Sequence, residues 1–112
     1  MTSFQRLLTV GLSLTLLCNA AIWLLIFFLV DRSTPTVITH YNIFFGPDGF
    51  GSWTDLLILP AIGGSVAALN YGVAGWLWRQ DRFLTYVAAS LALFVQIILV
   101  VATSLVIAVN RT

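Results

Sequence analysis

The chain has 112 residues, of which 60% are hydrophobic and 8% are charged, and its formal net charge is +1. Five arginines and four aspartates are too few to cover the surface of a soluble domain of this length. Nucleic-acid binding is excluded as well, because it needs clustered Lys and Arg side chains. The composition predicts an integral membrane protein whose solvent is membrane lipid.

Three long uncharged stretches organise the chain. A helix rises about 1.5 Å per residue, so roughly 20 residues cross the hydrocarbon of a bilayer. Backbone groups in lipid must be satisfied within the segment, and three stretches are too few for a closed barrel. The sequence predicts an all-α fold in one domain, residues 1–112, with transmembrane helices at about 7–30, 55–78 and 83–109 and a structured loop at 31–54.

The first predicted helix has to be weighed against a secretory signal peptide. Small side chains at Cys18-Asn19-Ala20 offer a cleavage-like spacing. The apolar stretch continues to Val30, about twice the length of a usual signal core, so we expect a retained helix. Cys18 is the only cysteine, which excludes a disulfide within the chain, and we expect it to be a small packing residue.

The loop at 31–54 is too long for a simple connection between packed helices. Thr34–Thr39 is rich in β-branched residues and contains a proline, so it is expected to run extended. Gly46–Gly49 reads Gly-Pro-Asp-Gly, which is typical of a tight turn. Apolar side chains lie on both sides of this turn. We therefore expect a compact cap on the helix ends.

The candidate acids, bases or ligands of this loop and its end are His40, Asp48 and Asp55. They make a poor metal site without a cysteine or a second histidine, and the glycines do not match a phosphate-binding loop. We expect no metal, no cofactor and no enzymatic activity. His40 is expected to pin a turn through backbone hydrogen bonds; contact with a partner or pigment, and pH sensing, are the alternatives.

Small residues recur along the second predicted helix at alternating spacings of four and three, which places them on one face. In lipid, small residues let helix backbones approach closely. We expect this helix to be the packing centre of the fold, although glycine and alanine are also simply common in membrane helices. The predicted seam consists of Ala61, Ser65, Ala68, Gly72 and Gly75.

Each predicted helix carries one amide side chain: Asn19, Asn70 and Gln96. Asn19 and Gln96 fall at the same level, roughly 20 Å from the end that holds the N-terminus. Unpaired amides in hydrocarbon are costly, whereas interhelical pairs contribute on the order of 0.6–2 kcal/mol. We expect these two amides to face inward and approach each other as packing residues. A transport site is the alternative, which the lack of ionisable residues in the three stretches disfavours.

Arginines flank the helices unequally. Arg6, Arg79 and Arg82 fall on one side of the membrane, and Arg32 and Arg111 fall on the other. The positive-inside rule then places the N-terminus in the cytoplasm, and the loop at 31–54 and the C-terminus outside. The short connection between the second and third helices makes them a tight antiparallel pair.

The loop pattern resembles a known family. A His-aromatic-Asn sequence, a Pro-Asp-Gly sequence and a Gly-Ser pair stand between the first two membrane helices, as in the bacterial membrane domain found in the N-terminal part of SdpI-type immunity and signal-receptor proteins. The resemblance covers about residues 34–111 and implies a bacterial cytoplasmic membrane protein. The matching residues are His40, Tyr41, Asn42, Pro47, Asp48, Gly49, Gly51, Ser52 and Pro60.

Two functions stay open. The first is a non-catalytic accessory subunit of a larger bacterial membrane complex, such as an energy-transducing one, in contact with other subunits and with lipids or pigments that they bind. The second, implied by the resemblance, is a small sensor or immunity protein that binds a peptide or toxin through the outer loop. The candidate residues that bind the partner or structure the loop are His40, Tyr41, Asn42, Pro47, Asp48 and Gly49. The first function is favoured because the cytoplasmic segments are too short to pass on a signal.

Overall fold

The computed structural model describes residues 2–30, 36–42 and 46–110. Three of its helices are long and apolar enough to cross a membrane, which confirms the predicted all-α membrane fold. A short two-stranded sheet stands between the first two of them. The elements are α1 (Ser3–Leu29), β1 (Val37–Asn42), β2 (Gly46–Gly51), the 3₁₀ helix η1 (Trp53–Leu57), α2 (Ile58–Leu77) and α3 (Arg82–Asn110).

The helices begin at residues that suit their free N–H groups. At the start of α1, the backbone N–H of Gln5 donates to the Thr2 hydroxyl, and the backbone N–H of Thr2 donates to the Gln5 side chain. At the start of α3, the Leu84 N–H donates to the Asp81 carboxylate at 3.1 Å. Pro60 is the third residue of α2, where its missing N–H costs little.

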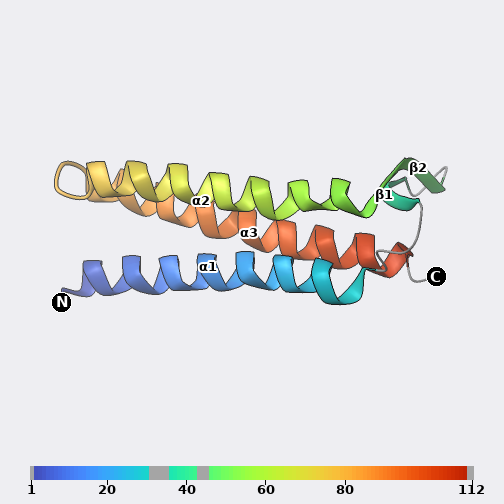
Figure 1. The fold of residues 1–112 in the computed structure, drawn as a ribbon. Coiled ribbons are helices and arrows are strands. Elements are labelled where there is room, and N and C mark those ends of the chain that lie inside the picture. The colour runs from blue at the N-terminus through green and yellow to red at the C-terminus, as the bar shows by residue number, and fades with distance from the viewer. Residues whose placement is uncertain (1, 31–35, 43–45, 111–112) are drawn as a thin grey trace.

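The three long helices lie side by side along the 50 Å length of the molecule, with α2 antiparallel to α1 and α3. Helix α3 contacts both α1 and α2, and it crosses the other two helices obliquely in the view of Figure 1. The start of α1 and the connection between α2 and α3 share one end, here called the turn end. The β-strands and the last residues of α3 share the opposite end, here called the hairpin end.

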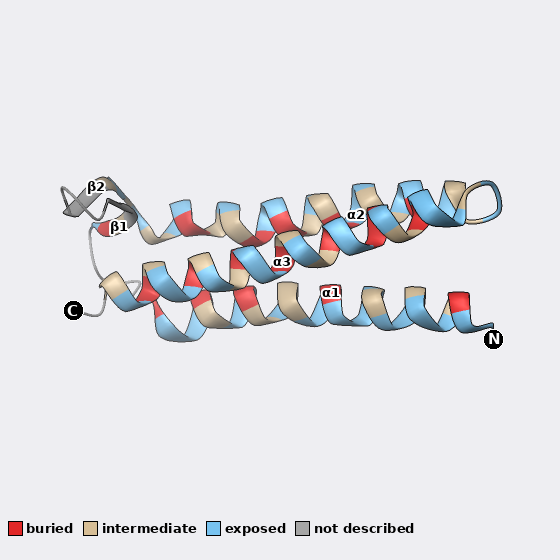
Figure 2. Ribbon diagram, turned by 180° about the vertical axis from the view of Figure 1, so that it is seen from behind, coloured by how far each residue is buried: buried red, intermediate tan, exposed pale blue. Residues whose placement is uncertain are grey.

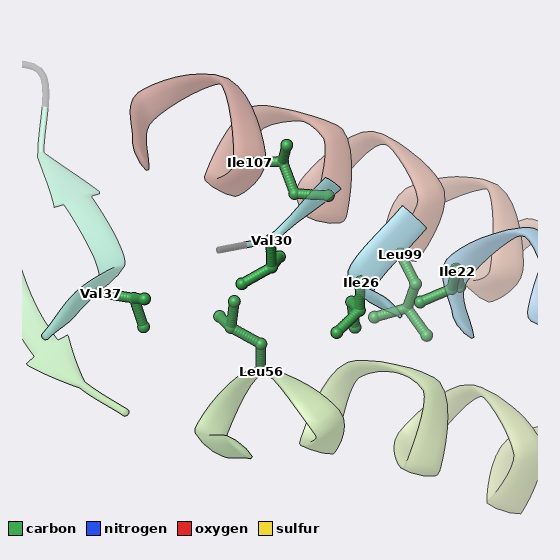
Figure 3. Packing of buried hydrophobic residues seen from close by; sticks show 7 residues of the cluster. All are labelled: Ile22, Ile26, Val30, Val37, Leu56, Leu99 and Ile107. Atoms are coloured by element: carbon green, nitrogen blue, oxygen red, sulfur yellow. The ribbon is translucent and has the colours of Figure 1, made fainter. Parts of the chain in front are cut away.

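The core changes character along the bundle. Near the hairpin end, large apolar side chains from α1, β1, η1 and α3 pack together (Figure 3). Towards the turn end, the buried side chains of α2 and α3 are mostly alanines, which allow the two helices to approach closely. The cluster at the hairpin end consists of Ile22, Ile26, Val30, Val37, Leu56, Leu99 and Ile107.

Helix α2 packs through small residues, but they are not the predicted ones. All five residues of the predicted seam are exposed, so the expectation that they pack within the bundle is corrected. At 3.6 residues per turn, the buried and the predicted faces lie roughly a third of a turn apart. Both carry small residues at helical spacing, and spacing alone therefore did not identify the buried one. Figure 2 shows this alternation of buried and exposed residues along the helices. The buried face of α2 consists of Pro60, Gly63, Ala67 and Ala74.

Candidate functional site

The segment between α1 and α2 contains an antiparallel pair of strands, β1 and β2. The residues from Gly46 to Gly49, predicted as a tight turn, are instead the first part of β2, which is a correction. The proline and glycines of this stretch do not form a turn that reverses the chain. They lie in the strand where its pairing with β1 is irregular. Pairing is irregular on both sides of His40, which lies opposite Gly49, as expected where residues of low strand propensity interrupt a ladder.

An amide at the end of α3 holds β1 in place. The Asn110 side chain accepts a hydrogen bond from the Ile38 backbone N–H at 2.7 Å and donates one to the Ile38 carbonyl at 2.8 Å. It also donates to the Val106 carbonyl of its own helix at 2.8 Å. The amide thus pairs with β1 as a neighbouring strand would, satisfying both backbone groups of one residue. The two hydrogen bonds between Asn110 and Ile38 are called the Asn110 clasp below.

A second polar contact fixes β2 to the start of η1. The Asp55 carboxylate accepts a hydrogen bond from the backbone N–H of Ser52 at 2.9 Å, closing a capping box at the beginning of the 3₁₀ helix. Gly51 lies against this carboxylate so closely that a Cβ there would collide with it. Both strands are therefore tied to helices, and the expectation of a built structure in this loop agrees with the geometry.

Apolar side chains seal the sheet against the helix ends. Val37 and Leu56 are buried and lie close to Val30 and Ile107 (Figure 3). The side chain of Phe50, in contrast, is not buried, and 62% of its surface is exposed. The strand pair thus has one attached side and one large exposed aromatic ring at the hairpin end.

Most of the predicted loop site lies in these two strands. His40, Tyr41 and Asn42 belong to β1, and Pro47, Asp48 and Gly49 belong to β2. The side chains of residues 39–42 and 46–48 lie outside the described part of the structure, so the role expected of His40 stays a prediction. In the described part of the chain, no group of three His, Cys, Asp or Glu side chains could hold a metal ion.

A second polar cluster lies inside the bundle, where all three helices meet at Gly63. The Asn19 amide of α1 donates to the Pro60 carbonyl at 3.0 Å, and the Gln96 amide of α3 donates to the Gly63 carbonyl at 2.6 Å. A Cβ on Gly63 would lie 2.9 Å from Asn19 Nδ2 and 2.8 Å from Gln96 Oε1. The two amides lie at one level, as predicted, but each donates to a carbonyl of α2 and not to the other amide. The third amide, Asn70, donates to a carbonyl of its own helix.

Gln96 is fully buried, in agreement with the expectation that it faces inward. Several other polar features of the bundle were not predicted from the sequence. The Oε1 atom of Gln96 has no hydrogen bond among the described residues. The hydroxyls of Tyr71 and Thr103 are also buried and have no hydrogen bond among the described residues. Gly11 makes room for the Tyr71 hydroxyl, which would lie 2.9 Å from a Cβ at that position. Asn110 was missed because it lies just beyond the predicted end of the third helix.

Comparison of the chain with protein-family models, with characterised proteins and with solved structures finds no match.

Proposed function

We propose that the chain is a non-catalytic accessory subunit of a larger bacterial membrane complex, for example an energy-transducing one. Its place would be the cytoplasmic membrane, where it would pack against a transmembrane helix of another subunit and against lipids or pigments that the complex holds. The three apolar helices support the membrane location. The resemblance of the loop to a bacterial membrane domain supports a bacterial origin.

One observation carries the proposal: helix α2 turns a face of small residues away from the bundle. Ala61, Ser65, Ala68, Gly72 and Gly75 are all exposed and are called the outward face of α2 below. A Cβ at Gly72 or at Gly75 would meet no atom of the described residues within 4 Å. Small residues give a membrane helix no advantage against lipid chains, but they allow the backbone of another helix to come close. The outward face of α2 therefore has the composition of a helix interface, and the described helices leave it uncovered.

Large exposed side chains border this face along one side. Ile62, Leu69 and Trp76 follow one another at helical spacing and are exposed. Together with the flat small residues they form a ridge beside a shallow surface, the shape into which the ridge of a second helix fits. The hydroxyl of Ser65 lies within this surface and could bond across such an interface.

The test is purification of the tagged full chain from its native membrane in mild detergent, with mass spectrometry and an absorption spectrum of the same fraction. We expect a stoichiometric partner that Ala68→Leu releases. Ala20→Leu is the matched control, because it makes the same change at an exposed position of α1. Recovery of a free monomer, or equal retention of the partner by both variants, would overturn the proposal.

The hairpin favours a second candidate function, the binding of a peptide or toxin as a sensor or immunity protein. The Asn110 clasp and the Asp55 cap hold the strands in place, which a mere connection would not need. Here His40→Ala, Asn42→Ala and Asp48→Ala should abolish protection against the toxin while membrane insertion persists. Protection that is unchanged in all three variants would dispose of this function.

A further inference from the structure

The outer face of α3 carries a shallow, largely open apolar groove close to the turn end. Its volume is about 550 Å³, and all of its lining residues come from α3. Five of the six are exposed, and Tyr86 is half-buried. They lie on a different side of α3 from its buried threonines and alanines, so the groove faces the surroundings of the bundle. The α3 groove is lined by Phe83, Tyr86, Val87, Ser90, Leu91 and Phe94.

The groove has the length of one leaflet. Its ends at Phe83 and Phe94 lie eleven residues apart, which at about 1.5 Å per residue corresponds to roughly 16 Å. Half of a hydrocarbon core of about 30 Å is roughly 15 Å. Because Phe83 directly follows the first residue of α3, the groove runs from the membrane surface toward the middle of the bilayer, as a single acyl chain does.

A positive charge stands beside the surface end of the groove. The Arg82 guanidinium lies over the Phe4 ring, 5.1 Å from its centroid. The same Phe4 ring packs edge-on against Tyr86 of the groove, at 4.9 Å between centroids. A guanidinium has five N–H donors, so one that contacts an aromatic ring keeps N–H groups able to bind a phosphate with two hydrogen bonds.

No protein carboxylate neutralises this charge in the described part of the chain. The neighbouring carboxylate, Asp81, accepts the Leu84 N–H as the cap of α3. Arg82 is exposed and makes its contact with an aromatic ring. An apolar groove of one leaflet's length, with an exposed guanidinium at its surface end, matches a molecule with one long apolar chain and a negative head group.

We propose that the α3 groove binds an anionic phospholipid of the leaflet at the turn end, with one acyl chain along Phe83 to Phe94 and the phosphate on Arg82. The groove lies on α3 and the surface assigned to a protein partner lies on α2, so this proposal stands independently of the accessory-subunit function. The charge of Arg82 favours lipids with a negative head group. The groove holds one acyl chain of such a lipid more firmly than the ordinary contact between a helix and the bilayer does.

The experiment compares two arginines of the turn end. The full chain is incubated in detergent with phosphatidylglycerol or phosphatidylcholine, and retained lipid is counted by native mass spectrometry. Wild type should retain phosphatidylglycerol in preference. Arg82→Gln should lower this preference about fivefold, which corresponds to the ~1 kcal/mol contributed by one basic residue at an anionic surface. The control is Arg79→Gln, because Arg79 is exposed at the same end but lies over Trp78, 4.9 Å from the ring centroid.

A second variant tests the groove itself. Ser90→Phe fills the groove at an exposed position, where a larger side chain leaves the core untouched, and it should reduce retention of phosphatidylglycerol without changing the helix content. Equal losses in Arg79→Gln and Arg82→Gln would show general surface attraction and overturn the site. Unchanged retention in Ser90→Phe, or release of a protein partner by that variant, would overturn it as well.

Discussion

Gly63 is the residue at which the three helices depend on one another. Asn19 and Gln96 approach it from α1 and α3, and both donate to carbonyl groups of α2. Trp23 extends this contact, because its indole N–H donates to Asn19 Oδ1 at 3.2 Å. Any side chain at Gly63 would occupy the space that the two amides need. In lipid, apolar surface does little to hold helices together, so these polar contacts and the close packing around them carry much of the association.

We expect Gly63→Ala to lower the free energy of unfolding by about 1–3 kcal/mol, because the new methyl group displaces two amides from their acceptors. The measurement is reversible unfolding of the full chain in mixed detergent micelles. The control is Gly72→Ala, where a Cβ meets nothing within 4 Å and a better helix former should add up to about 1 kcal/mol. Equal effects of the two substitutions would contradict the role assigned to Gly63.

At the level of elements, the hairpin depends on a helix that lies far away in the sequence. Ile38 and Asn110 are 72 residues apart, yet they form the clasp that fixes β1 to α3. Two-stranded hairpins are marginally stable alone. This one is supported by the clasp, by the Asp55 cap and by the burial of Val37.

Removing the clasp should loosen the hairpin and leave the bundle intact. Asn110→Ala deletes both bonds to Ile38 and leaves two partly buried backbone groups without these partners, which should cost about 1–3 kcal/mol. We expect hydrogen exchange of the β1 amides to become about tenfold faster or more. Ser104→Ala serves as the control, since this exposed hydroxyl bonds to the Val100 carbonyl of its own helix. Unchanged exchange in β1 would show that the clasp does not hold the strand.

The sequence was sufficient to predict those elements that are determined by the composition of their own residues. Long apolar stretches predicted the three helices, and β-branched residues predicted the extended segment that runs into β1. Strand β2 was missed because its first four residues, Gly-Pro-Asp-Gly at 46–49, have the composition of a turn and take strand positions only by pairing with β1.

The buried face of α2 was missed for a different reason. Small residues recur at helical spacing on two faces of this helix, and the choice between them depends on α1 and α3. The shared depth of Asn19 and Gln96 in the membrane could be calculated by counting residues along the sequence. The carbonyl groups to which they donate could not be identified in this way. Backbone carbonyls are present at every residue, so no pattern of side chains marks the ones that receive a bond.

At the scale of the whole molecule, the bundle has two chemically different ends. Arg6, Arg79 and Arg82 are exposed at the turn end, and the last two lie over aromatic rings. The hairpin end carries the sheet and the large apolar cluster. Arg32 and Arg111, which the positive-inside argument placed at this second end, lie outside the described residues.

We expect the turn end to face the cytoplasm. Single cysteines at Gln80 and Thr54, introduced into a chain with Cys18→Ala, would report the two ends, because both positions are exposed. In intact cells, a membrane-impermeant thiol reagent should label the cysteine at position 54 and not the one at position 80. Permeabilised cells provide the control, since both should then react. Labelling of position 80 alone in intact cells would reverse the orientation.

The Asn110 clasp also has a consequence for the order in which the protein is made. The strand that it holds leaves the ribosome 72 residues before the amide that secures it. At a synthesis rate of about 5–20 residues per second, that interval is roughly 4–15 s. During this time α1 and the hairpin residues have been synthesised while α3 is still being made, so the hairpin acquires its final support only when the last helix has entered the membrane.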